Sequence, residues 1–233
     1  MGEREADFSI HYLKEIHLFG HELWITTTHV SLLIISVVLI ILAVLVNRKV
    51  KASKPEDTPG MLQNIFEMVV SALDNMVHGI MGENGKRFLN YIGTVFIFAL
   101  LCNISGIFGL RAPTADYGVT LPLGVITFVM IHYCGIKKNK MRHFTDLFRP
   151  SPILFPINLI GELAVPLSLS LRLFGNILSG TVMMGLIYGL LSPPITTGIP
   201  AVLHVYFDLF SGCIQAYVFC MLTMVYINDK IGD

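Results

Sequence analysis

The sequence predicts an all-α polytopic membrane protein, and three observations lead to that prediction. Of its 233 residues, 54% are hydrophobic and only 14% are charged. The mean hydropathy is +0.69, and a soluble domain of this size could not bury so much apolar surface. The apolar residues also gather in runs near the roughly 20 residues that a helix needs to cross a bilayer. We expect a single membrane domain with about five transmembrane helices, one interfacial amphipathic helix, and two long tilted helices at its C-terminal end.

The composition also excludes several classes of protein. The formal net charge is zero, which argues against a nucleic-acid partner. Neither a cofactor nor a metal is expected, because the four cysteines lie in apolar segments without CxxC spacing and are interpreted as structural thiols. Residues 1–29 lack a basic start followed by an apolar core. They are therefore predicted to be an external N-terminal segment rather than a cleavable signal peptide.

The first half of the chain contains one predicted span and one predicted interfacial helix. The span covers residues 30–46 (VSLLIISVVLIILAVLV), and a run of Arg and Lys follows it at 48–54. After a Pro/Gly break at 55–60, apolar residues recur at helical spacing among polar ones over 61–81. That pattern is typical of an amphipathic helix lying at the membrane interface.

The second half contains the remaining spans. Residues 88–110 and 119–136 are predicted to cross the membrane, with a short polar turn between them. A second basic run occupies 137–149. Residues 152–191 then form a long helix that must tilt to fit a bilayer, and a Pro/Gly loop separates it from the last helix, 200–228.

The distribution of basic residues predicts the orientation. If the basic run after the first span is cytoplasmic, alternation puts 12 of the 16 Lys and Arg residues on that side. They are Arg48, Lys49, Lys51, Lys54, Lys86, Arg87, Lys137, Lys138, Lys140, Arg142, Arg149 and Lys230. The positive-inside rule then predicts an external N-terminus and a cytoplasmic C-terminus.

Arg172 is the least expected residue of the long helix. The stretch 152–191 carries only one other charged side chain, Glu162. An arginine near the centre of a membrane helix costs about 2.5–3.5 kcal/mol on insertion scales, so such a charge usually has a function. Ser168, Asn176 and Ser179 share its face at helical spacing. The polar stripe formed by these four residues could also merely join helices within the protein.

Two carboxylates are expected at opposite depths around this arginine. Glu162 precedes Arg172 by ten residues, or about 15 Å along the helix axis. On the antiparallel last helix, Asp208 and Gln215 are seven residues apart and are predicted to share one face. The amide of Gln215 can hydrogen-bond a guanidinium without neutralising it. The arrangement indicates two half-channels that do not connect, separated by a permanent cation that blocks direct passage.

The strings PINLIGELAVP, SLSLRLFGNILSG and GCIQAYVFCMLTMVYI resemble the a subunit of the membrane sector of rotary F-type ATP synthases. The resemblance extends over the whole chain. It implies that Arg172 matches the family's essential arginine and that Asn176 matches the asparagine near it. On the same resemblance, Gln215 matches the glutamine of the family's last helix, and Glu162 matches the carboxylate on the cytoplasmic release side. It also implies as partners a rotating ring of c subunits, the b subunits of the peripheral stalk, and membrane lipid.

This chain departs from the family pattern at two positions. Many members carry a glutamate where this chain has Thr181, and several have His or Glu where it has Asp208. Asp208 is therefore expected to carry a larger share of the uptake path. Ser168, Ser179 and Thr181 are further candidates for lining the channel, and Asp116 and His29 are weaker candidates for an outer vestibule. A lone histidine at the end of a span is more often an interfacial anchor.

The expected function is that of a proton-translocating stator subunit in a bacterial plasma membrane, with the ATP chemistry on other subunits. Its only transported substrate would be H⁺ or Na⁺, and the sequence leaves that choice open. An alternative is a self-contained channel or secondary transporter with a midplane arginine, although the chain has no internal repeat. An intramembrane hydrolase would need a base on the face of Ser168 and Ser179. A purely structural subunit fits everything except the two-sided acids.

Overall fold

The computed structural model describes residues 12–18, 21–52, 60–140, 152–190 and 199–232. Five of its helices are long and apolar enough to cross a membrane: Thr27–Lys51, Leu89–Phe108, Tyr117–Lys138, Phe155–Gly189 and Val202–Ile231. The all-α polytopic fold class predicted from the sequence is therefore confirmed. One element is additional, since strands β1 (Tyr12–Leu18) and β2 (His21–Thr26) pair as an antiparallel hairpin before the first helix.

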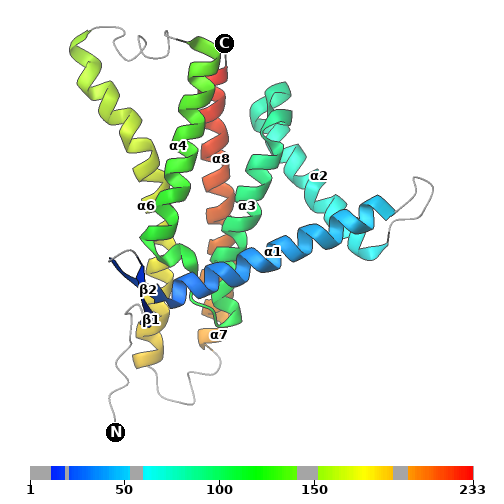
Figure 1. The fold of residues 1–233 in the computed structure, drawn as a ribbon, viewed down its shortest axis with the longest axis vertical. Coiled ribbons are helices and arrows are strands. Elements are labelled where there is room, and N and C mark those ends of the chain that lie inside the picture. Colours follow the sequence, from blue (N-terminus) through cyan, green and yellow to red (C-terminus); the bar gives the residue numbers. More distant parts are fainter. Residues whose placement is uncertain (1–11, 19–20, 53–59, 141–151, 191–198, 233) are drawn as a thin grey trace.

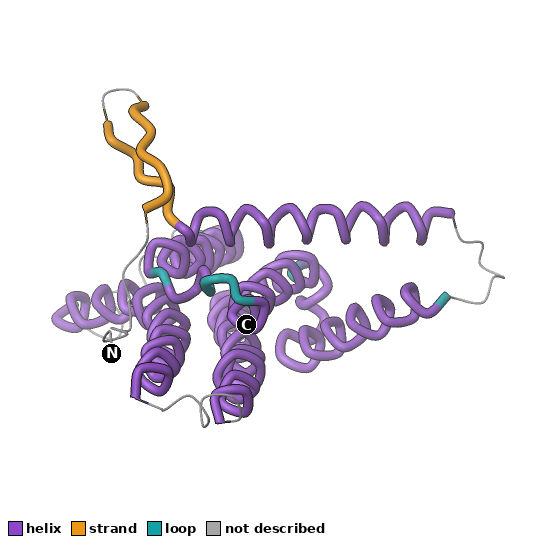
Figure 2. The backbone as a smooth tube through the Cα atoms, turned by 90° about the horizontal axis from the view of Figure 1, so that it is seen from below, coloured by secondary structure: helices purple, strands orange, loops and turns teal. Residues whose placement is uncertain are grey.

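Helices α1 (Thr27–Ala52) and α2 (Met61–Met81) extend to one side of the other helices, as Figures 1 and 2 show. Helix α1 continues beyond the predicted span through its basic residues. Lys49 and Lys51 lie in its last turn, where their positive charges interact favourably with the negative end of the helix dipole. Most of its apolar side chains are exposed, as is appropriate for a helix surrounded by lipid.

Helix α2 is amphipathic, as its sequence pattern predicts. Leu73, Val77 and Met81 recur every four residues and are buried, whereas Met61 and Met68 are strongly exposed. The helix ends at Gly82, whose φ of +55° suits glycine, and a 3₁₀ turn over Gly82–Arg87 leads to the next helix.

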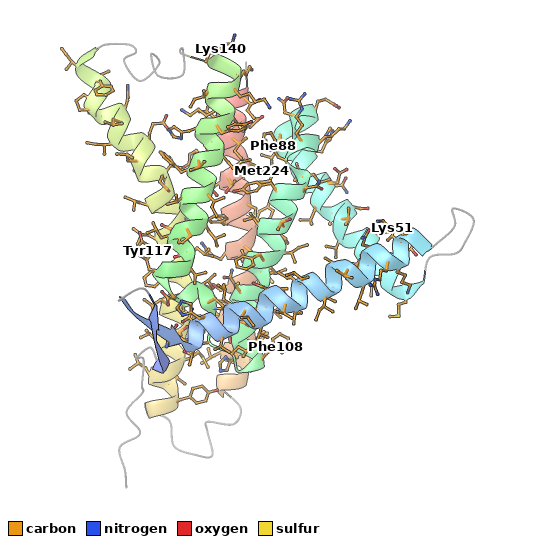
Figure 3. All side chains as sticks on the ribbon, in the orientation of Figure 1. Lys51, Phe88, Phe108, Tyr117, Lys140 and Met224 are labelled. Atoms are coloured by element: carbon orange, nitrogen blue, oxygen red, sulfur yellow. The ribbon has the colours of Figure 1, made fainter. Side chains whose placement is uncertain are left out.

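Helices α3 (Leu89–Ile104), α4 (Tyr117–Asn139), α6 (Phe155–Leu190) and α8 (Gly212–Ile231) form the main bundle. The predicted span 88–110 ends in a 3₁₀ turn, Ser105–Phe108, and another follows at Pro113–Ala115. Tyr117 and Lys140 mark the two ends of α4 in Figure 3. Residues 141–149 of the second basic run, and the loop at 191–198, lie outside the described part of the chain.

The core of the bundle lies where α8 packs against α3, α4 and α6. Ile92, Leu173 and Met224 are fully buried there, and Figure 3 shows Met224 among the surrounding helices. Two glycines allow the helices to approach closely. A Cβ on Gly124 of α4 would lie 2.7 Å from the carbonyl oxygen of Pro166 on α6. A Cβ on Gly212, at the start of α8, would lie 3.0 Å from the Cβ of Asn103 on α3.

The last predicted helix, 200–228, consists of three parts. A short helix α7 (Ile199–His204) leads into a π-helical segment η6 (Val205–Ser211), and α8 then continues to Ile231. A π-helix has more residues per turn than an α-helix, so seven-residue spacing across it does not return to the same face. The predicted common face of Asp208 and Gln215 is altered for this reason.

Candidate functional site

Arg172 lies on an exposed face of α6. Ser168, Asn176 and Ser179 are exposed on the same face, whereas Leu173 on the other side of the helix is fully buried. Within the described residues, the guanidinium of Arg172 has no hydrogen bond or ion pair. The polar stripe therefore faces outward from the bundle.

Asn176 connects this stripe to the last helix. Its side-chain Nδ2 donates a hydrogen bond of 2.5 Å to Oε1 of Gln215. Gln215 is only 4% exposed, and its Nε2 is buried without a partner in the described structure. The amide predicted to lie near Arg172 is thus bonded to Asn176 rather than to the guanidinium. The Nε2 group of Gln215 is therefore a buried donor that a nearby acceptor could satisfy.

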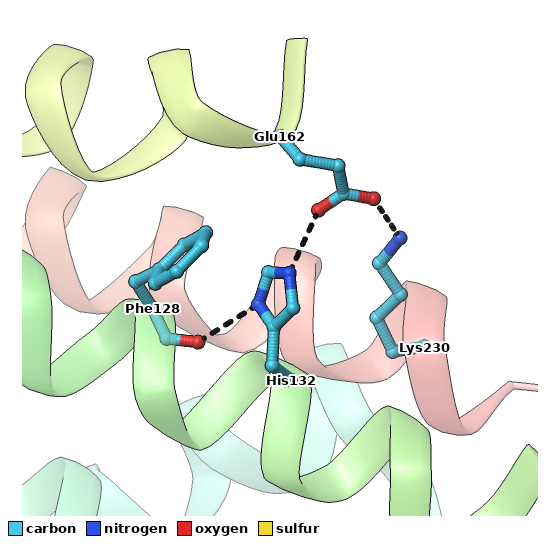
Figure 4. Close-up of polar contacts among 4 residues, drawn as sticks. All are labelled: Phe128, His132, Glu162 and Lys230. Carbon is cyan, nitrogen blue, oxygen red and sulfur yellow. Dashed lines mark hydrogen bonds and ion pairs between the residues drawn. The ribbon is translucent and has the colours of Figure 1, made fainter. Parts of the chain in front are cut away.

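Glu162 belongs to a three-residue cluster, shown in Figure 4, that we call the Glu162 cluster. The ammonium of Lys230, near the end of α8, donates to Oε1 of Glu162 at 2.5 Å. On the other side, Nε2 of His132 on α4 lies 3.6 Å from Oε2 of Glu162. All three side chains are partly exposed, between 19% and 24%. Three helices therefore meet at this carboxylate.

Asp208 belongs to a second cluster, formed with His204 and Tyr188, that we call the Asp208 cluster. Nδ1 of His204 lies 2.6 Å from Oδ2 of Asp208, and its Nε2 lies 3.0 Å from the Tyr188 hydroxyl. The imidazole thus links a phenol on α6 to a carboxylate in the π-helical segment. A Cβ on Gly106, in the turn after α3, would lie 3.0 Å from this carboxylate. Glu162 lies near the C-terminal end of α8 and Asp208 lies before its start, so the two acids occupy opposite ends of the bundle.

A cavity of about 430 Å³ lies beside the start of α1 and is lined by both predicted vestibule residues, His29 and Asp116. Asp116 also caps α4, accepting a hydrogen bond of 2.9 Å from the backbone N–H of Gly118. The imidazole Nδ1 of His29 lies 2.7 Å from the Thr26 hydroxyl. The hydroxyl of Thr28 is buried at this cavity without a partner among the described residues, and Asp208 does not line the cavity. The structure thus brings His29 and Asp116 together and keeps Asp208 apart from them.

Two of the predicted lining residues, Ser179 and Thr181, bond to their own helix. The Thr181 hydroxyl donates to the carbonyl oxygen of Ile177 at 2.9 Å, and the Ser179 hydroxyl donates to that of Asn176 at 2.9 Å. Thr181 therefore does not replace the missing carboxylate chemically, because its hydroxyl is engaged in a local hydrogen bond.

Sequence reasoning did not single out His132, Lys230, Tyr188 or His204 as site residues. The i, i+4 spacing of His204 and Asp208 was a usable signal for their pairing. For the ion pair of Lys230 with Glu162 the sequence holds no such signal, because 68 residues separate the partners.

Comparisons with known proteins agree with the geometry. Residues 29–228 match the family model described as ATP synthase A chain. A sodium-ion-specific ATP synthase subunit a from Propionigenium modestum is 38% identical over 88% of this chain and 75% of its own length. The ATP synthase subunit a of Priestia megaterium is 36% identical over 92% of this chain and 99% of its own length. That of Bacillus subtilis is 32% identical over 88% and 92%.

A match over this much of the chain identifies the family, and the function that follows is that of an ion-translocating subunit in the membrane sector. It implies association with the ATP synthase complex as a multi-pass membrane protein. The five apolar helices and the match over residues 29–228 lead to one conclusion: the chain belongs to the family of ATP synthase subunit a.

Proposed function

We propose that the chain is a stator that passes protons along two offset half-paths separated by Arg172, and that it performs no ATP chemistry itself. One observation carries this proposal: the Glu162 cluster and the Asp208 cluster lie at opposite ends of the bundle, while Arg172 has no ion pair in the described structure. A continuous channel would not need a fixed cation at its centre, whereas two half-paths need one to prevent a direct leak.

The outward-facing stripe supports a second subunit as the source of the missing counter-charge. Ser168, Arg172, Asn176 and Ser179 are exposed, and small residues allow close approach of another helix in a membrane. A ring of c subunits, each with a mid-membrane carboxylate, is the partner for this face. The exposed helix α1 is available to the b subunits of the peripheral stalk and to lipid.

In the proposed cycle, a proton enters from outside through the Asp208 cluster and protonates a ring carboxylate that has just left Arg172. The neutral carboxyl can then face lipid at low cost, and the ring turns until this group reaches the Glu162 cluster. Approach to Arg172 favours the ionised carboxylate, so the proton is released to the cytoplasm. Each charge that crosses the whole membrane contributes about 2.3 kcal/mol per 100 mV.

The orientation follows from the same distribution of charge. Lys51, Lys140 and Lys230 lie at the ends assigned to the cytoplasm by the positive-inside rule, which leaves the N-terminus outside. The relatives are bacterial proteins, and this supports the bacterial plasma membrane as the location.

The coupling ion is a proton in this proposal. Both clusters contain an imidazole, and the Asp208 cluster also contains a phenol. Such groups exchange protons, whereas a hard alkali cation is held mainly by oxygen ligands. The name of the Propionigenium modestum relative specifies sodium. ATP-driven acidification of inverted vesicles that needs no added Na⁺ is the expected result, and strict dependence on Na⁺ would assign sodium instead.

The decisive variant is Arg172→Ala in the assembled complex. We expect loss of both ATP-driven proton pumping and proton-driven ATP synthesis, because the two half-paths are no longer separated by a fixed charge. Arg48→Ala, at the exposed end of α1, is the matched control and should pump normally. Normal pumping by a fully assembled Arg172→Ala complex would overturn the proposed function.

A further inference from the structure

The protonation state of His132 is restricted by its two neighbours. Its Nδ1 lies 3.1 Å from the backbone carbonyl oxygen of Phe128, one helical turn earlier on α4. A carbonyl oxygen only accepts hydrogen bonds, so Nδ1 must carry the hydrogen. The other ring nitrogen, Nε2, is therefore either a bare lone pair or the second N–H of an imidazolium. It is this nitrogen that faces Glu162 in Figure 4.

The contact with Glu162 is favourable when one proton lies between the two groups. A bare Nε2 lone pair 3.6 Å from an ionised carboxylate would place two acceptors against each other. The contact becomes favourable when His132 is an imidazolium or when Glu162 is protonated. The pair is thus arranged to hold one exchangeable proton, and a movement of a few tenths of an ångström would close it to hydrogen-bond distance.

Lys230 lies on the other side of the carboxylate. Its ammonium donates to Oε1 of Glu162, the oxygen that His132 does not face. The carboxylate therefore contacts a cation through one oxygen and the His132 imidazole through the other. The His132 side chain is 24% exposed, which leaves it open to exchange with water.

From this geometry we propose that His132 is the proton-carrying residue of the release path, and that Glu162 and Lys230 form a fixed ion pair that positions it. The proposal rests on the function proposed above and names a carrier within it. The O–H bond of a ring carboxyl breaks, directly or through water, and an N–H bond forms at Nε2 of His132, leaving a carboxylate on the ring. The Nε2–H bond then breaks to a cytoplasmic water, and the lone pair returns to the nitrogen.

His132→Gln tests the proposal, because glutamine keeps hydrogen-bonding capacity but does not take up a proton at neutral pH. The assay measures passive proton flow through the assembled membrane sector in vesicles, driven by a potassium diffusion potential and expressed per assembled complex. We expect flow to fall about tenfold or more, since a positioned acid–base group typically contributes about 10²–10⁴-fold. His78→Gln, on the exposed face of α2, is the matched control and should conduct normally.

Chemical rescue separates proton transfer from a structural role. His132→Ala leaves space for a free imidazole, and added imidazole should restore at least part of the lost flow relative to the unmodified complex at the same concentration. A structural loss would not respond to imidazole.

Two outcomes would overturn the assignment of His132. One is an assembled His132→Gln complex that conducts at the unmodified rate. The other is a His132→Ala complex that assembles and stays inactive with imidazole, which would assign a structural role. Arg172→Ala is tested beside them by ATP-driven proton pumping of the complete complex. If it remains coupled, the proposed function fails; if it uncouples while His132→Gln is normal, only the role of His132 fails.

Discussion

Arg172 has no hydrogen bond or ion pair among the described residues, and its side chain differs from that of lysine in ways that suit this position. The guanidinium is planar, stays protonated and offers five donors, whereas the lysine ammonium is compact and loses its proton more readily when desolvated. Asn176, one turn away, already bonds Gln215 and holds the adjoining surface of α6 and α8 together. The stripe is therefore organised around a cation that must remain charged.

Arg172→Lys should consequently fail to support coupled transport even though it keeps a basic side chain. We expect ATP synthesis in vesicles to fall at least about tenfold, on the scale of losing a positioned charged hydrogen-bonding group. Assembly should be normal, because Arg172 is exposed and has no partner in the described part of the chain. Synthesis at the unmodified rate would show that any cation suffices.

Asp208 is the residue on which proton uptake should depend most. Asp208→Asn removes the carboxylate but keeps the size of the side chain, so the His204 imidazole loses its ionic partner at 2.6 Å. We expect proton-driven ATP synthesis to slow about tenfold or more. The control is Asp74→Asn, an exposed position on α2 that should have no effect. An unchanged rate for Asp208→Asn would move the uptake relay elsewhere, with the His29 and Asp116 cavity as the next candidate.

At the scale of elements, helices α4 and α6 approach closely at a glycine, Gly124. A Cβ at position 124 would come within 2.7 Å of the Pro166 carbonyl oxygen, which belongs to backbone and cannot turn aside. Pro166 also lacks the N–H that would bond the carbonyl of Glu162, so the helix is already weakened at this contact. The positions of Glu162 on α6 and His132 on α4 both depend on this packing.

Gly124→Ala should therefore force the two helices apart. We expect destabilisation of about 1–3 kcal/mol, the range for overpacking a close contact, together with slower proton release. Thermal unfolding of the detergent-solubilised protein measures the first effect. Gly79→Ala on α2 is the matched control, because a Cβ there meets nothing within 4 Å. Equal stability of the two variants would mean that the helices can separate at no cost.

The elements also show what sequence patterns can and cannot predict. Apolar runs and basic flanks predicted the spans, because lipid imposes length and hydropathy on each helix separately. The π-helical segment Val205–Ser211 was not predicted, since a single inserted turn leaves the hydropathy of the last helix unchanged. Arg172, Glu162 and Asp208 were recognisable as isolated charges in apolar segments. Lys230 and His132 were not, because they reach Glu162 only once three helices have packed together.

On the scale of the whole molecule, the two clusters and the basic residues define an axis along the bundle. Lys230 and the basic end of α4 lie near the Glu162 cluster, whereas the Asp208 cluster lies at the other end of the bundle beside the turn Ser105–Phe108. Basic residues are retained on the cytoplasmic side during insertion. The same bias that orients the chain thus puts a cation beside the proposed release path.

This axis predicts which ends of the bundle an impermeant reagent can reach. In a background lacking the four natural cysteines, Phe108→Cys and Lys140→Cys introduce thiols at exposed positions on opposite ends, as Figure 3 shows. In right-side-out vesicles, a charged maleimide should label Cys at position 108 and not at 140; inverted vesicles should give the reverse. Both sites should react after detergent treatment, which confirms that each thiol is present. The opposite labelling pattern would mean that the chain has the reverse orientation in the membrane. The Asp208 cluster would then lie on the cytoplasmic side, where protons are released during synthesis.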